Sequence, residues 1–546
     1  MNVNHTESAA DILIRGNVIF DSLSDVPFRG AVAVKGNRIA AVLKDDDGAM
    51  MADAHTKIVD AGGRLVMPGF HDNHVHLLMA GMFREYVNLI DCRSAEESAK
   101  LAYEAAQKDE DKSGWVIGFQ WYHVFWDNPE LPDKKTLDAY FPDRPVFLLN
   151  AEAHGCWLNS AGLKRAGITK DTPDPDGGVI VRDETGEPTG ILLEGAVALV
   201  TIHALVFPPE KERSLIRSYM DGAKAYGITS LIDVMPYFHG NMGDLSIYSE
   251  MDRSGELTTR IHAAPDLFGD LDLVLDWQKK YNSEKLTVNH VKQFVDGVFT
   301  THTALMLDDY ADKSGDRGLS LFDTDAIEAA VPEAHKRGLS VKLHCLGDRA
   351  NRMALDYYEK AIRLYGKNNC RHAIEHCELV TEEDIPRFGQ LGIVPSVQPE
   401  QIALTQIYAE NPYPAVLGKD RAWQTWRLRD LLASAGVMAF GSDCPVIDNN
   451  PFFEIYRAVT RVHNDGEPAG GQNPAQKLTV AESLKAYTAG SAYSALRDHE
   501  LGSLRAGNFA DIIILDRNLF ETDDIKNARV DLTVFDGEII YERDKG

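Results

Sequence analysis

The feature that most constrains this chain is an alternation of short apolar runs with longer helical stretches through its middle. Such alternation is typical of βα units around a parallel sheet. Helices over 325–337 and 380–391 are predicted to end at Gly338 and Gly392, which are common helix stop signals. Eight runs are predicted as strands, namely 64–68, 228–232, 259–262, 290–295, 339–344, 372–376, 392–395 and 437–440. The fold class is therefore predicted to be α/β, with a distorted TIM-type (β/α)8 barrel.

The two ends of the chain have a different, β-rich pattern. Residues 11–66 read as short strands with hairpin turns, one of them at Gly36-Asn37. Similar strands return at 510–515, 532–535 and 538–541, around an Asp536-Gly537 turn. Because neither end has enough strands to bury a sheet face alone, we expect one small β-sandwich built from both termini.

These patterns suggest the domain boundaries. We expect residues 1–65 and 501–546 to form the sandwich and residues 66–500 to form the barrel. About 150 residues separate the first and second barrel strands, which is far longer than an ordinary connection. An inserted subdomain is therefore expected at about residues 90–215, after the first barrel strand.

Composition excludes several classes of function. Asp and Glu number 83 against 56 Lys and Arg, and the formal net charge is −27. Such a surface repels phosphate backbones and anionic lipid, so we expect neither nucleic-acid nor membrane partners. The six cysteines form no C-x-x-C pair, residues 1–11 lack an apolar segment, and no apolar run approaches ~20 residues. A cytoplasmic location is expected.

The residues that carry chemistry begin with His74-x-His76, where an apolar strand ends. Residues two apart on an extended chain point to the same side, so both imidazoles can face one cation. By itself, such a pair is equally consistent with packing. Other candidates follow or lie within predicted barrel strands, where barrel active sites are built: Lys292, His344, His376 and Asp443. Each alone has a plain structural explanation, but their gathering at one barrel rim predicts a metal centre.

This order of ligand types resembles that of the amidohydrolase superfamily. The flanking residues are similar to its branch of N-substituted formamide deformylases and related amide hydrolases, in the stretches 66–76, 145–154, 291–297, 343–349, 374–376, 440–443 and 502–511. The resemblance implies that His74 and His76 hold one divalent ion with Asp443, and that His344 and His376 hold a second. It also implies that Lys292, carboxylated by carbon dioxide, bridges the two ions.

The implied activity is metal-dependent hydrolysis of a non-peptide C–N bond in a small molecule, such as an amide, formamide, cyclic amide or carbamate. A hydroxide that the metal, most readily zinc, activates would attack the carbonyl, and Asp443 would carry the proton to the leaving nitrogen. If Lys292 is unmodified, one ion at His74, His76 and Asp443 suffices, and His344 or His376 acts on the substrate. A deaminase or other-bond hydrolase and a non-catalytic, metal-binding regulatory protein are the alternatives. A homodimer is expected.

Three further residues are predicted to contact the substrate. His154 matches a histidine that this branch carries in the same context, and Trp121 belongs to an aromatic cluster typical of an apolar pocket. Core packing is the alternative explanation for Trp121. The third is His302, because the branch usually shows a glycine-serine-arginine stretch where this chain has Thr300-Thr-His-Thr303. This departure places a titratable ring where relatives carry a guanidinium.

Overall fold

A computed structural model of the 546-residue chain describes residues 9–109, 112–123, 126–151, 155–175, 178–234, 245–320 and 323–543. The chain forms two compact units. Unit 1 consists of Met1–Leu77 together with Met220–Gly546, and unit 2 consists of Leu78–Tyr219. The residues at which an insertion was expected, about 90–215, lie within the range of unit 2.

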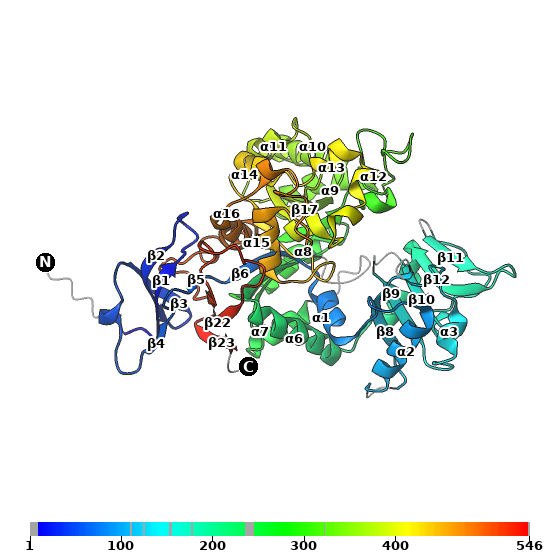
Figure 1. Cartoon of the computed structure of the whole chain (residues 1–546), viewed down its shortest axis with the longest axis horizontal. Helices are drawn as coiled ribbons and strands as arrows, with labels where there is room; N and C mark the ends of the chain where they lie inside the picture. Colours follow the sequence, from blue (N-terminus) through cyan, green and yellow to red (C-terminus); the bar gives the residue numbers. More distant parts are fainter. Residues whose placement is uncertain are drawn as a thin grey trace. The chain divides into compact units, whose positions relative to one another are not determined.

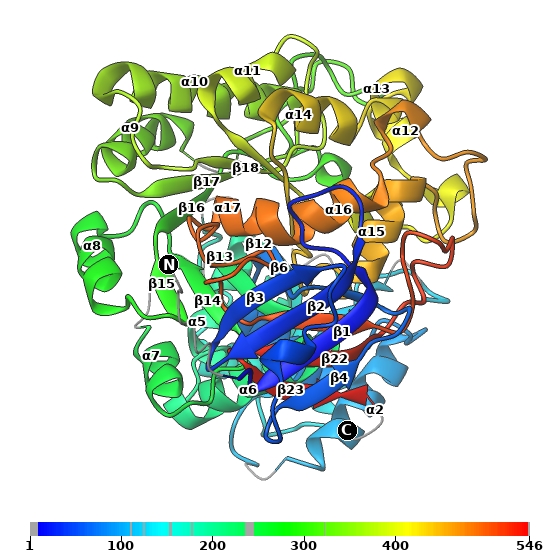
Figure 2. The same cartoon turned by 90° about the vertical axis from the view of Figure 1, so that its left-hand side faces the viewer.

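Strands from both ends of the chain form one eight-stranded sheet in unit 1. The blue and red strands of this sheet lie side by side in Figures 1 and 2. The link between the two ends is the antiparallel pairing of β5 with β21, in which Met67 faces Ile513. The strands are β1 (Ile12–Ile19), β2 (Phe28–Lys35), β3 (Arg38–Lys44), β4 (Lys57–Asp60), β5 (Leu65–Pro68), β21 (Ile512–Leu515), β22 (Val530–Phe535) and β23 (Glu538–Glu542). Apolar residues from both ends of the chain pack into one core.

Parallel strands in the remainder of unit 1 form the barrel. Within the described residues, the ring consists of β6 (Phe70–Val75), β13 (Ile228–Val234), β14 (Arg260–Ala264), β16 (His290–Phe294), β17 (Ser340–Cys345), β18 (Ala373–His376), β19 (Val394–Val397) and β20 (Ala439–Phe440). Bridges between Asp266 and Lys292 and between Val75 and Cys444 join the two sheets of the ring. β15 (Leu286–Val288) leads into β16. The fold is thus TIM-barrel-like.

The first barrel strand differs from the sequence prediction. The run 64–68 was predicted to start the barrel, but it forms β5 and joins the terminal sheet. The barrel begins instead with β6, whose residues are all buried although four of them are polar. Asp72 and Asn73 have partners inside the barrel, since Asp72 accepts bonds from Ser442 and Asn73 donates to Ser396. Burying a polar group is costly unless it is hydrogen-bonded, so these bonds support the strand. The ring nitrogens of His71 have no hydrogen-bond partner among the described residues.

Helices follow or precede the barrel strands, and α9 and α10 pack against β17 (Figure 2). The predicted helix 325–337 is confirmed as α9, and the predicted helix 380–391 begins later, as α11. The helices of unit 1 are α7 (Ser246–Arg253), α8 (Leu271–Lys280), α9 (Thr324–Lys336), α10 (Asp348–Tyr365), α11 (Ile385–Leu391), α12 (Tyr413–Val416), α13 (Lys419–Trp423), α14 (Leu428–Ala435), α15 (Pro451–Thr460), α16 (Val480–Lys485) and α17 (Ser491–Ser494). Short 3-10 helices include η4 (Phe299–Thr301) and η5 (Pro399–Ala403).

Unit 2 contains a six-stranded mixed sheet in the order β11-β12-β10-β9-β8-β7. Its strands are β7 (Val87–Asn88), β8 (Val116–Trp121), β9 (Val146–Asn150), β10 (Gly155–Leu158), β11 (Gly178–Arg182) and β12 (Pro188–Glu194). Its helices are α1 (Leu77–Glu85), α2 (Ala95–Ala106), α3 (Lys134–Asp138), α4 (Ser160–Arg165), α5 (Ala198–Ala204) and α6 (Pro209–Ala225), the last of which runs on into unit 1. Across the described residues of both units, no helix is long and apolar enough to cross a membrane.

Candidate metal centre

Three predicted ligands meet where the first and last barrel strands adjoin. His74 lies in β6 and His76 directly follows it, while Asp443 follows β20. The backbone N–H of Asp443 donates to the carbonyl of His74, which holds the two strand ends together. The Nε2 atoms of His74 and His76 each lie 3.3 Å from Oδ1 of Asp443. All three ligand atoms lie within 4.8 Å of one another, so they converge on one point.

His344 and His376 lie beside this group. They stand near the ends of the neighbouring strands β17 and β18, and their ring centroids are 4.3 Å apart. The His376 ring is also 5.3 Å from the His74 ring. Burial lowers the pKa of His376 to about 4, so its imidazole is neutral and has a lone pair to offer near neutral pH.

Lys292, in β16, completes the set. Its side chain is fully buried, and its Nζ has no hydrogen-bond partner among the described residues. The Nζ atom lies 3.9 Å from the centroid of the Phe294 ring. Burial lowers the pKa of Lys292 to about 8, which makes the uncharged amine accessible near neutral pH. Lys292 lies in the middle of its strand. Burial, with a further contribution from the charge of this lysine, lowers the pKa values of His76, His344 and His376.

Sequence reasoning missed two residues that support these ligands. Glu375 in β18 lies 2.7 Å from Nδ1 of His74 and also accepts a hydrogen bond from Lys342. Gln401 in η5 bonds both His376 and Asp443. A signal existed for Glu375, because an acid within an apolar strand must have a partner. No local pattern marks Gln401.

The predicted substrate residues are placed differently. Trp121 is in the core of unit 2, where its indole N–H donates to the Leu148 carbonyl. His302 lies with its Nε2 atom 3.0 Å from Asp312 in its own loop, and its ring packs against Tyr310. His154 lies outside the described residues. The substrate roles of all three remain predictions.

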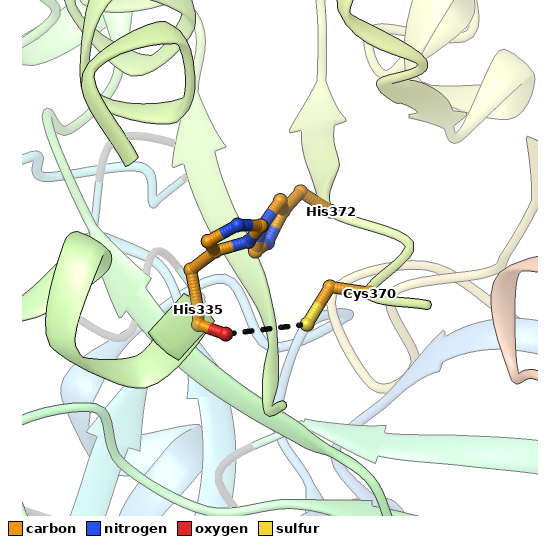
Figure 3. A group of neighbouring side chains, drawn as sticks. All are labelled: His335, Cys370 and His372. Atoms are coloured by element: carbon orange, nitrogen blue, oxygen red, sulfur yellow. Dashed lines mark hydrogen bonds between the residues drawn. The ribbon is translucent and has the colours of Figure 1, made fainter. Parts of the chain in front are cut away.

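A second group of possible ligands, His335, Cys370 and His372, does not suit a metal ion (Figure 3). The backbone N–H of Val341 donates to Nδ1 of His372, so the proton of that neutral ring is on Nε2. This proton is donated to Nδ1 of His335, whose Nε2 in turn donates to the Gly366 carbonyl. Every ring nitrogen is thus already used. We interpret the group as a structural hydrogen-bond chain.

The donor set at the barrel rim fits a divalent ion. Imidazole nitrogens and a carboxylate oxygen are the ligands that zinc and similar ions take in proteins. The unpartnered amine of Lys292 also fits, because a carbamate on this nitrogen would supply oxygen ligands and remove the opposing positive charge.

Comparisons with known proteins agree with this chemistry. Residues 57–541 match a family model described as the Amidohydrolase family. Protein LONG AFTER FAR-RED 3 of Arabidopsis thaliana is 32% identical over 97% of this chain and 92% of the relative. N-substituted formamide deformylase of Arthrobacter pascens is 27% identical over 94% of this chain and 95% of the relative. A solved structure described as an uncharacterized metal-dependent hydrolase from Pyrococcus furiosus superposes with a TM-score of 0.75 at 26% identity. That superposition covers 93% of this chain and all of the other.

Proposed function

Since the chain belongs to the amidohydrolase family, we propose that it uses bound divalent metal to hydrolyse a non-peptide C–N bond in a small molecule. Family membership makes it a hydrolase of C–N bonds, and the substrate size and the details of the site are our proposal. The observation that carries the proposal is the convergence of His74 and His76 on one oxygen of Asp443, each at 3.3 Å.

We assign the ligands as follows. His74, His76 and Asp443 hold one ion, which we propose is zinc, and His344 and His376 hold a second. Lys292, carboxylated on its buried amine, would supply oxygen ligands to the bound metal. Within the part of the chain that the structure describes, its Nζ has no hydrogen-bond partner. This supports the role, because a buried amine left unpartnered is costly unless it is modified or used.

When bound, the metal would lower the pKa of water and polarise the substrate carbonyl. Asp443 is placed to move the proton. Burial opposes its ionisation, but the charge of His74 and the hydrogen bonds from His74 and His76 hold the pKa of Asp443 well below its ordinary value. Asp443 therefore starts as a carboxylate that can accept a proton from water and then deliver it to the departing nitrogen.

The substrate class is proposed from one relative. N-substituted formamide deformylase aligns with nearly the whole chain, which favours a formamide or a comparable small amide. We propose that the loop carrying His302 selects among such substrates. The alternative to be tested is deamination of a substrate that carries an amino group on a ring, because the same metal site could catalyse that reaction.

The test combines metal analysis with a substrate panel of N-substituted formamides, cyclic amides, carbamates and aminopurines. We expect bound zinc or a similar ion and turnover of a formamide or amide. The His74→Ala, His76→Ala double variant should lose both metal and turnover. Full turnover by that variant would refute the proposal. Turnover of aminopurines alone would replace amide hydrolysis with deamination.

A further inference from the structure

The side chain of Gln401 connects two of the proposed ligands. Gln401 lies in η5, directly beyond β19, one of the barrel strands for which no site residue was predicted, and it is 6% exposed. Its Nε2 donates to Oδ2 of Asp443 at 3.0 Å. Its Oε1 lies 3.3 Å from Nδ1 of His376. One amide therefore contacts a ligand from each of the two proposed ion sites.

The chemistry of the partners determines which way this amide points. A carboxylate only accepts hydrogen bonds, so the N–H end of Gln401 must face Asp443. The carbonyl end then faces His376, and this contact requires the proton of the His376 ring to be on Nδ1. A neutral imidazole carries one such proton, so Nε2 of His376 keeps its lone pair. Fixing the tautomer in this way is what partners of metal-binding histidines do.

The same amide gives the two oxygens of the Asp443 carboxylate different partners. Oδ2 is occupied by the N–H of Gln401, while Oδ1 faces the Nε2 atoms of His74 and His76, each at 3.3 Å. One oxygen is thus anchored to the protein and the other is presented to the ligand cluster. Without the anchor, the carboxylate could rotate and offer either oxygen.

We propose that Gln401 is a positioning residue of the metal centre, which fixes the tautomer of His376 and directs Oδ1 of Asp443 toward the ion. This inference rests on the proposed function, because it assumes that His376 and Asp443 bind metal. Its effect on catalysis is indirect, through these two ligands.

Gln401→Met is the main test variant, because it keeps the length of the side chain and removes both hydrogen bonds. Gln476→Met is its matched control. Gln476 is 5% exposed and also bonds a carboxylate, that of Asp430, but among the described residues it has no hydrogen bond to a proposed ligand. Gln401→Asn is a second variant that retains an amide too short to span both partners, in case the methionine variant fails to fold.

Metal affinity is measured for the full-length protein with Zn²⁺ by competition with a chelator, together with the visible absorption of the Co²⁺-loaded protein. We expect Gln401→Met and Gln401→Asn to bind Zn²⁺ about 10–100-fold more weakly and to change the Co²⁺ spectrum. Gln476→Met should bind Zn²⁺ as the unaltered protein does. The melting temperatures of the metal-free proteins report the purely structural cost of each change.

Two results overturn the inference. The first is that both Gln401 variants have the same Zn²⁺ affinity and the same Co²⁺ spectrum as the unaltered protein. The other is a loss of affinity of the same size in Gln476→Met. If the unaltered protein itself binds no metal and hydrolyses nothing in the panel, the proposed function fails instead, so the two failures are distinguishable.

Discussion

Nδ1 of His74 lies 2.7 Å from Oε2 of Glu375, and both side chains are fully buried. The carboxylate accepts a hydrogen bond from the N–H at Nδ1 of the His74 ring, so Nε2 of His74 is left to face Asp443. The other oxygen of Glu375 accepts a hydrogen bond from Lys342, also at 2.7 Å. A carboxylate behind a ligating histidine orients the ring and raises its basicity.

Replacing Glu375 by glutamine should weaken metal binding by about 10–100-fold. The single variant also leaves Lys342 buried and unpaired, at a cost of about 3–5 kcal/mol in the free energy of unfolding. The Glu375→Gln, Lys342→Met double variant should recover much of that stability without recovering metal affinity. Chelator competition and urea unfolding measure the two effects. Unchanged metal affinity in Glu375→Gln would contradict the role of Glu375 in orienting His74. Glu383→Gln is the control, because the side chain of Glu383 is exposed on the surface.

Asp443→Asn should lower kcat by about 10²–10⁴-fold, because the amide cannot take a proton from water. Metal content is measured on the same sample, since Asp443 is also a proposed ligand. A loss of kcat larger than the loss of bound metal indicates the proton-transfer role. Turnover that stays in proportion to metal content would assign Asp443 to metal binding alone.

Lys292→Ala should lose the second metal ion, because the oxygen ligands of the proposed carbamate are absent. Short carboxylic acids such as acetate or propionate should restore part of the metal content and the activity by filling the same space. Native mass spectrometry of the unaltered protein should show the added mass of one carbon dioxide. Two tightly bound ions in Lys292→Ala without added acid would argue against the carbamate as a metal ligand.

Glu482 provides a pH prediction away from the metal centre. Burial opposes its ionisation, but bonds from Arg429 and Thr479 hold the pKa of Glu482 at about 2, below the ordinary value of 4.5. A depressed pKa stabilises the folded state above the unfolded value, and this stabilisation is lost as the pH falls through the folded value. Because the pair is partly exposed, we expect Glu482→Gln to cost about 1–2 kcal/mol at pH 7.

That cost should shrink below about pH 4.5 and vanish near pH 2, the window between the unfolded and folded pKa values. Urea unfolding of both proteins at neutral pH and at several acidic values measures it. A cost that does not change with pH would show that the Glu482 charge is not its source.

Cys370→Ser should leave the bound metal unchanged. His335 and His372 already use their ring nitrogens in a hydrogen-bond chain, so Cys370 has no metal to share with them. Elemental analysis of the purified variant beside the unaltered protein measures this. A loss of one metal equivalent would make this group a second metal site.

The start of the barrel shows where sequence prediction fails. The run at 64–68 is apolar and suits any buried strand, whereas Phe70–Val75 contains four polar side chains and so lacks the apolar pattern of a buried strand. What makes β6 a buried strand is bonding to distant residues, such as Asp72 with Ser442. No pattern within the strand itself contains that information.

The supporting residues around the ligands show the same limit. His74 and His76 were recognised because their spacing on an extended chain is a local property. Gln401 was not recognised, because its contacts with His376 and Asp443 depend on how separate barrel strands are arranged.

The amino-acid sequence alone determined three things about this protein: the alternation of strands and helices, the ligands near the strand ends, and the resemblance to a family. These are set by the period of side-chain direction and by residue type, which act over a few neighbouring residues. Tertiary structure alone decided which strand opens the barrel and which partners fix the ligand tautomers. A hydrogen bond such as that between His74 and Glu375 joins residues 301 positions apart, and only closure of the barrel brings them within reach.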